Sequence, residues 1–223
     1  MKLPQNEFLK SFEIIIQTGA ILAVVALYWR KFLNIELIKR LIVAFIPTGA
    51  IGFVLYKLIK SAFIGNTSLT LWVLGVGGLL LIIFERTRRG KTLYTSSLEM
   101  MDYKTCFLIG VAQSVAVVPG VSRAAATIVG GMLLGVERKT IVEFSFLLAV
   151  PTMIAATAFD IIKNPSVLAG GQIDLLVVGF GVSFVVALVS IKWLLAYIKG
   201  HTFTAFGIYR MAVAIIFGLG AVL

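Results

Sequence analysis

The chain has 223 residues, of which 60% are hydrophobic and 13% are charged, and its mean hydropathy is +1.04. Soluble domains carry about 25% charged residues, so this composition indicates an integral membrane protein. A single cysteine, Cys106, and a single histidine, His201, exclude a disulfide framework and a Cys- or His-based metal cluster. The net charge of +10 is interpreted as membrane topology and not as nucleic-acid binding, because the basic residues accompany long apolar runs.

Six apolar segments approach the length that is needed to cross a hydrocarbon core about 30 Å thick. No linker or low-complexity stretch separates them, so we expect an all-α polytopic protein with one membrane domain over 1–223. The predicted transmembrane segments are 12–29, 41–59, 69–84, 144–162, 174–198 and 205–223.

Between the third and fourth segments lies another apolar run, 105–136, whose only formal charge is Arg123. Pro119-Gly120 should break this run, because proline lacks a backbone donor and glycine is a poor helix former. The two halves would each be about 21–24 Å long at 1.5 Å per residue, which is too short to cross the membrane. We therefore predict a re-entrant helix-loop-helix whose tip is buried in protein or lines a water-filled cavity.

The distribution of basic residues tests this topology. If 105–136 enters and leaves on one face, the loops 30–40, 85–104, 137–142 and 199–204 share a side and carry twelve Lys and Arg, against five on the other side. A single crossing by 105–136 would weaken the ratio to nine against eight. The positive-inside rule then places the twelve in the cytoplasm and both termini outside.

Arg123 is the residue most indicative of function, since a cation at the membrane centre usually faces a cavity, a partner or a substrate. Ser122 fits the N-cap of a helix beginning at Arg123, whose first amides and dipole would bind an anion. We expect the Ser122 and Thr127 hydroxyls and the Arg123 guanidinium to converge on one small volume. The planar fork of arginine favours phosphate or diphosphate binding. The alternative is a structural ion pair with a buried carboxylate, such as Glu13 or Glu143.

The stretch QSVAVVPGVSRAAATIVGGMLLG resembles the second signature of the undecaprenyl-diphosphate phosphatases, the bacitracin-resistance family. In that pattern a glutamine precedes a P-G-x-S-R-S-G-x-T core. The stretches 12–31, 143–160 and 201–215 are also similar to the family, so the likeness extends over nearly the whole chain. The matching positions of the signature are Gln113, Pro119, Gly120, Ser122, Arg123 and Thr127.

The resemblance implies an enzyme of the bacterial plasma membrane that removes the terminal phosphate of a C55 polyprenyl diphosphate and so regenerates the lipid carrier of cell-wall synthesis. It also implies inverted repeats, each with a re-entrant hairpin, whose tips meet inside the membrane. The predicted catalytic residues are Ser122, Arg123 and Thr127, and the predicted substrate-binding residues are Gly120, Gln113, Arg210, Glu13 and Gln17.

Three of these residues have a second interpretation. Glu13 and Gln17 share a helix face near the external end of their segment, where Glu13 is equally consistent with a solvated interfacial residue. Arg210 lies near the start of the last segment, where its guanidinium could snorkel to the interface, whereas the resemblance places it among diphosphate-contacting cations. A divalent cation, Mg or Ca, is implied by the resemblance alone. Membrane lipids and a second copy of the chain are the other expected partners.

Two departures from the family pattern leave three hypotheses open. The first signature, an acidic segment running into E-F-L-P-x-S-S-T-G-H, is not found before Phe12, so we expect the family's glutamates, its histidine and one hairpin to be missing. Ala124 and Ala125 stand where the second signature has Ser and Gly. The hypotheses are a phosphatase, a non-catalytic polyprenyl-phosphate binder or transporter, and an inactive truncated remnant.

Overall fold

The computed structural model describes residues 7–58, 66–87, 97–163 and 173–220, and within these ranges the chain forms helices and no strand. The α-helices are α1 (Glu7–Tyr28), α2 (Ile35–Leu58), α3 (Thr67–Thr87), α4 (Tyr103–Ser114), α5 (Arg123–Leu133), α6 (Arg138–Lys163), α7 (Ile173–Tyr197) and α8 (Thr204–Gly220). Short 3₁₀ turns lie at Lys31–Leu33, Leu98–Met100 and Val115–Val117.

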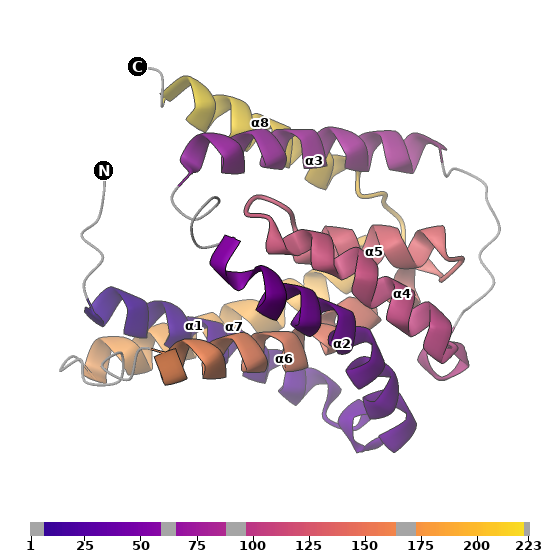
Figure 1. Cartoon of the computed structure of the whole chain (residues 1–223), viewed down its shortest axis with the longest axis horizontal. Coiled ribbons are helices and arrows are strands. Elements are labelled where there is room, and N and C mark those ends of the chain that lie inside the picture. The colour runs from indigo at the N-terminus through magenta and orange to yellow at the C-terminus, as the bar shows by residue number, and fades with distance from the viewer. Residues whose placement is uncertain (1–6, 59–65, 88–96, 164–172, 221–223) are drawn as a thin grey trace.

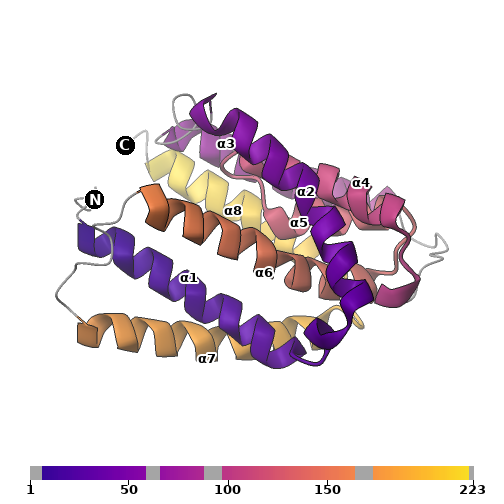
Figure 2. The same cartoon turned by 60° about the horizontal axis from the view of Figure 1, so that its bottom comes forward.

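The helices pack side by side with a short hairpin between two outer pairs (Figures 1 and 2). Helix α1 packs along α7, and α3 packs along α8. The α4–α5 hairpin lies between these pairs, where α4 contacts α2 and α5 contacts α6. The predicted all-α polytopic architecture is therefore confirmed.

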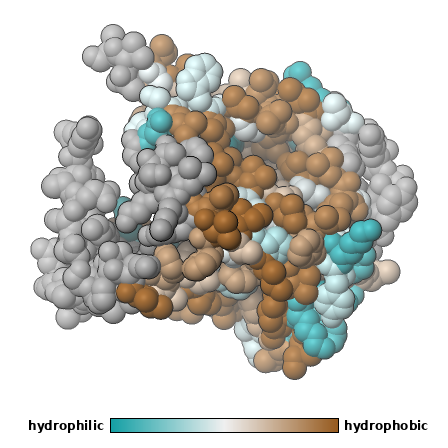
Figure 3. Space-filling view, in the orientation of Figure 1, coloured by the Kyte–Doolittle hydropathy of each residue, from teal (hydrophilic) through white to brown (hydrophobic). Residues whose placement is uncertain are grey.

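Four of the six predicted spans are long and apolar enough to cross a membrane. These lie within α2, α3, α6 and α7, and their mean hydropathy ranges from 1.8 to 2.4. Helices α1 and α8 carry shorter apolar segments in the described residues, Ile15–Tyr28 and Thr204–Leu219. The side of the molecule seen in Figure 3 is largely hydrophobic, with polar residues at the end where α2 begins, as expected for a surface that meets lipid.

The broken helix predicted at 105–136 is a hairpin. Helix α4 has 12 residues and α5 has 11, which correspond to about 18 Å and 16 Å of rise and cannot span the hydrocarbon core. Both helices are shorter than the sequence suggests, because a 3₁₀ turn and an extended segment carry the chain around the tip. Gly120 has a φ of +92°, and a Cβ at this position would lie 2.5 Å from the backbone oxygen of Thr70 in α3.

Four pairs of consecutive helices, α1–α2, α3–α4, α5–α6 and α7–α8, are joined at the same end of the molecule. Helix α1 begins and α8 ends at the opposite end, which also holds the start of α3 and the end of α6 (Figure 1). This arrangement agrees with re-entry of 105–136 on a single face. Part of the basic loop 85–104, namely 88–96, lies outside the described residues, and the cytoplasmic assignment of that end stays a prediction.

A buried ion pair joins the elements at the end where the hairpin enters. Glu85, near the end of α3, is 3% exposed, and its carboxylate lies 2.8 Å from Nη2 of Arg138, at the start of α6. The same carboxylate accepts a hydrogen bond from the backbone N–H of Phe203, and Arg138 donates to the backbone oxygen of His201. The sequence alone assigns both charges to loops, because it does not show that these loops pack together.

We predict that a cysteine placed on each side of the membrane will report this topology. Ser68→Cys, at the exposed start of α3, should react with a membrane-impermeant maleimide in intact cells, whereas Lys199→Cys, after α7, should react only after permeabilisation. Cys106 is fully buried and is expected to stay unlabelled. Labelling of Lys199→Cys in intact cells would contradict the orientation.

We also predict that Glu85→Gln strongly destabilises the protein in detergent. Removal of one partner of a fully buried pair costs about 3–5 kcal/mol, and because Arg138 is 23% exposed we expect a loss toward the lower end of that range. The matched control is Glu99→Gln, which breaks an exposed pair with Lys31 and should cost less than about 1 kcal/mol. Thermal unfolding would measure both, and equal shifts would refute a special role for Glu85.

Candidate functional site

The start of α5 is the centre of the candidate site. The Ser122 hydroxyl oxygen accepts a hydrogen bond of 3.2 Å from the backbone N–H of Ala125, which confirms the predicted N-cap. The N–H of Ala126 is bonded to the backbone oxygen of Ser122. Within the described ranges the amides of Arg123 and Ala124 have no such partner. Two free donors at a helix N-terminus can serve an anion.

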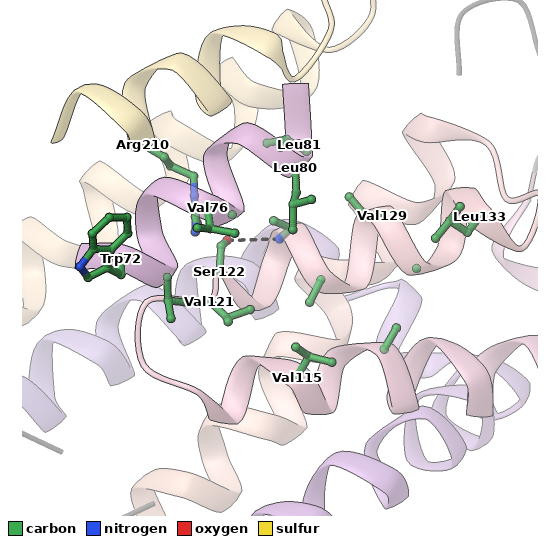
Figure 4. Close-up of a pocket in the computed structure, with 16 residues that line it drawn as sticks. Trp72, Val76, Leu80, Leu81, Val115, Val121, Ser122, Val129, Leu133 and Arg210 are labelled. Carbon is green, nitrogen blue, oxygen red and sulfur yellow. Dashed lines mark hydrogen bonds between the residues drawn. The ribbon is translucent and has the colours of Figure 1, made fainter. Parts of the chain in front are cut away.

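A cavity of about 550 Å³ lies between α3 and the hairpin and reaches this helix start. Its walls are mostly aliphatic, and the only charged or hydroxyl side chains among its lining residues are Ser122 and Arg210 (Figure 4). The lining residues are Trp72, Val73, Val76, Gly77, Leu80, Leu81, Ala112, Val115, Val121, Ser122, Ala125, Ala126, Val129, Gly130, Leu133 and Arg210.

Arg210 extends from α8 toward the hairpin tip. Its Nη2 donates a 2.8 Å hydrogen bond to the backbone oxygen of Gly120, while its Nε is buried and has no hydrogen-bond partner in the described structure. A Cβ on Gly77 of α3 would lie 2.7 Å from Nη2 of Arg210, so this glycine makes room for the guanidinium. The structure therefore brings together three predicted site residues, Gly120, Ser122 and Arg210.

Arg123 points to the other side of α5. It lines a second cavity, of about 370 Å³, whose other walls come from α1, α6 and α7. Its guanidinium lies 3.4 Å from the backbone oxygen of Ala149 and 3.6 Å from the sulfur of Met153. No carboxylate among the described residues lies within 4.0 Å of Arg123. The alternative of an ion pair with Glu13 or Glu143 is therefore not realised.

The predicted convergence of Ser122, Arg123 and Thr127 on one volume is wrong. Ser122 and Arg123 are consecutive at a helix start, so their side chains diverge by roughly 100° around the axis. They consequently line different cavities, one on each side of α5. Thr127 lies one turn further on and is fully buried in the protein core. The first turn of α5 thus separates two chambers, each of which contains one guanidinium.

Thr127 and Gln113 belong to a polar cluster in the core. The Thr127 hydroxyl contacts Oε1 of Gln113 at 3.1 Å and the backbone oxygen of Arg123 at 2.9 Å. The Gln113 amide nitrogen donates to the hydroxyl oxygens of Thr48 in α2 and Thr152 in α6, at 3.0 and 3.4 Å. Gln113 is 1% exposed and lines neither of the two cavities. These contacts hold the first turn of α5 in place, and they leave Gln113 and Thr127 away from both cavities.

Thr48 and Thr152 were not singled out from the sequence. Each directly follows a proline inside an apolar helix, Pro47 in α2 and Pro151 in α6. A hydroxyl beside a proline in a membrane helix is a recognisable signal, because it can serve backbone groups that the proline frees. Both hydroxyls reach one glutamine because α2 packs against both α4 and α6, which only the tertiary structure shows.

Glu13 and Gln17 are exposed and lie outside both cavities. At helical spacing they share a face of α1 with Ala20, Ile21 and Val24, which line the chamber that contains Arg123. The structure places them about one to two turns beyond Ala20, toward the end where α1 begins.

Residues 1–216 match the family model of the bacitracin resistance protein BacA. The chain belongs to this family.

Similar proteins include the undecaprenyl-diphosphatase of Sulfurihydrogenibium sp. (strain YO3AOP1), which is 52% identical over 97% of this chain and 85% of its own length. The undecaprenyl-diphosphatase of Aquifex aeolicus is 47% identical over 96% of this chain and 84% of its own length. The protein of the same name from Methanococcus aeolicus is 44% identical over 97% and 84% of the two chains.

The described residues do not supply a site that fits a divalent cation. They contain no group of three or more His, Cys, Asp or Glu side chains placed to hold a metal ion. The side chains that line the two chambers include two guanidiniums and no carboxylate. Mg and Ca prefer carboxylate and carbonyl oxygens, so a cation remains an implication of the family alone.

We predict that Thr127→Val lowers stability while it preserves side-chain volume. The valine removes the hydroxyl that the Gln113 oxygen contacts in the core, and an unsatisfied buried polar group costs about 1–3 kcal/mol. Thr127→Ser, which keeps the hydroxyl, is the matched control and should unfold close to the wild-type temperature. Thermal unfolding in detergent distinguishes the two. A Thr127→Val protein as stable as wild type would show that the cluster contributes little.

Proposed function

We propose that this protein is a phosphatase of the bacterial plasma membrane that hydrolyses undecaprenyl diphosphate to undecaprenyl phosphate and inorganic phosphate. Family membership and the names of the relatives support this activity. The structural observation that carries it is a helix start inside apolar sequence with free amides and a guanidinium on either side, neither of which has a carboxylate within 4.0 Å in the described residues. Such cations call for an anionic ligand.

In the proposed complex the diphosphate lies across the first turn of α5. Arg210 and the Ser122 hydroxyl meet it from one chamber, and Arg123 meets it from the other. The free amides of Arg123 and Ala124 point along the helix axis at the same place. A diphosphate carries adjacent negative charges, and hydrolysis moves further charge onto the bridging oxygen. Donors fixed in advance around that charge stabilise the transition state.

Ser122 is assigned to phosphate contact and not to nucleophilic attack. A serine nucleophile needs a base within hydrogen-bond reach, and the described residues place neither a histidine nor a carboxylate beside its hydroxyl. We propose water as the nucleophile: its oxygen bonds to the terminal phosphorus as the bridging P–O bond breaks, and its protons remain with the released inorganic phosphate. Gln17 is assigned to the entrance of the chamber that contains Arg123, since it lies on the same face of α1, whereas Glu13, whose carboxylate would repel a diphosphate, is assigned to the membrane interface. Thr127 and Gln113 are assigned to positioning the first turn of α5.

The activity is tested by phosphate release from undecaprenyl diphosphate by the purified chain. Wild type should release phosphate, and Arg123→Ala should lower the rate by about 10²–10³-fold, the typical loss when one preorganised donor is removed. The matched control is Arg30→Ala, which removes an exposed arginine that stacks on Trp29 after α1. Its rate should stay close to wild type.

Two outcomes would contradict the proposal. Release by wild type no faster than by Arg123→Ala would refute catalysis at this site. Arg123-dependent binding of the lipid diphosphate without phosphate release would identify a binder instead. A homo-oligomer stays a prediction, which the mass of the detergent-solubilised protein would test.

A further inference from the structure

The cavity between α3 and the hairpin has two chemically different ends (Figure 4). Ser122 and the Arg210 guanidinium lie at one end, beside the hairpin tip. Leu80, Val129 and Leu133 lie toward the other end and present only hydrocarbon. From Ser122 to Leu133 the wall formed by α5 is about 16 Å long at 1.5 Å per residue. The cavity thus combines a cationic end with an apolar channel.

The walls of the channel are two regular helix faces. On α5 the lining residues from Ser122 to Leu133 recur at helical spacing, and on α3 they recur likewise from Trp72 to Leu81. Ala125, Ala126 and Gly130 keep the α5 wall shallow, whereas valines and leucines project from α3 and from the outer end of α5. The small side chains of α5 face the larger side chains of α3, and the space between them fits a narrow, methyl-branched prenyl chain.

The channel opens sideways to the surroundings of the protein. Four of its lining residues are also large apolar residues on the outer surface: Trp72, Leu80, Val115 and Leu133 are 75%, 60%, 58% and 56% exposed. In a bilayer these residues meet hydrocarbon. A lipid chain whose charged group lies at Arg210 can therefore leave the cavity directly into the membrane.

We propose that this channel is the subsite for the first isoprenoid units of the lipid substrate, with Leu80 and Leu133 at its opening. The inference rests on the proposed function for the identity of the substrate. The position of the prenyl chain is inferred from the cavity. The occupant is inferred from the juxtaposition of Arg210, which lines the cavity and has no carboxylate within 4.0 Å in the described residues, with an apolar channel, which matches a lipid that carries phosphate at one end.

The subsite contributes to turnover mainly by aligning the substrate and contributes little hydrophobic binding energy. A prenyl chain that moves from lipid into an apolar channel gains little transfer energy, because lipid tails are as apolar as leucine. What the channel supplies is alignment: units held between α3 and α5 fix where the diphosphate meets the first turn of α5. Blocking the opening should therefore lower turnover of long-chain substrates more than that of a substrate with a single isoprenoid unit.

The direct test is photolabelling of the full chain in detergent with a farnesyl diphosphate analogue that carries a diazirine on its first isoprenoid unit. We expect the label on the channel faces of α3 and α5, between residues 72 and 81 or 121 and 133, and we expect excess undecaprenyl diphosphate to remove it. A label in the Arg123 chamber or on the outer faces of α7 and α8 would overturn the assignment. A channel label that undecaprenyl diphosphate does not displace would identify a general lipid site and would overturn it too.

A pair of variants provides the kinetic test. Leu80→Trp should narrow the opening and lower kcat/KM for undecaprenyl diphosphate by about tenfold, as for other apolar pocket contacts, with isopentenyl diphosphate hydrolysis unchanged. Leu79→Trp adds the same bulk one position away, at a residue that is 46% exposed and does not line the cavity, and should behave as wild type. Equal effects of the two variants, or equal losses for both substrates, would refute the subsite.

These measurements separate the inference from the proposed function. If wild type releases no phosphate but the label lies in the channel and is displaced by undecaprenyl diphosphate, the subsite stands and the phosphatase proposal fails. If phosphate is released but the label lies elsewhere, the phosphatase proposal stands and the subsite fails.

Discussion

A helix broken inside a membrane leaves backbone donors and acceptors that lipid cannot satisfy, and the surrounding structure supplies partners for several of them. Ser122 caps the start of α5, Arg210 donates to the carbonyl of Gly120, and Thr48 donates to the carbonyl of Gly110. Each partner comes from a different place in the sequence. The hairpin is therefore stable only where α2, α3, α6 and α8 surround it.

The same break creates the candidate site. An intact helix would hide the amides of Arg123 and Ala124 in its own hydrogen bonds, whereas a helix that starts in mid-membrane presents them together with the positive end of its dipole. Two guanidiniums flank this start, and the cost of placing them in apolar surroundings is offset when an anion arrives. Because the proposed anion is attached to a lipid tail, the site can lie within the membrane and still be reached.

Two sets of contacts hold the hairpin tip and the first turn of α5 in place. The polar cluster of Gln113 with Thr48, Thr127 and Thr152 fixes the first turn of α5 from the core side. Arg210 fixes the tip from α8, passing Gly77, where no side chain obstructs it. Both anchors hold the helix start in the absence of substrate, and donors positioned in advance are the condition under which electrostatic stabilisation is strong.

The sequence by itself determined the membrane class, the six apolar segments, the break at Pro119-Gly120 and the Ser122 cap, because hydropathy, proline geometry and capping act over a few neighbouring residues. It also pointed to Arg123 and, through the family resemblance, to Arg210. Only the tertiary structure decided that Ser122 and Arg123 face separate chambers, that Thr127 and Gln113 lie in the core, and that Glu85 pairs with Arg138. Those features depend on which helices lie on each side of α5, and that is set by long-range packing that no local pattern records.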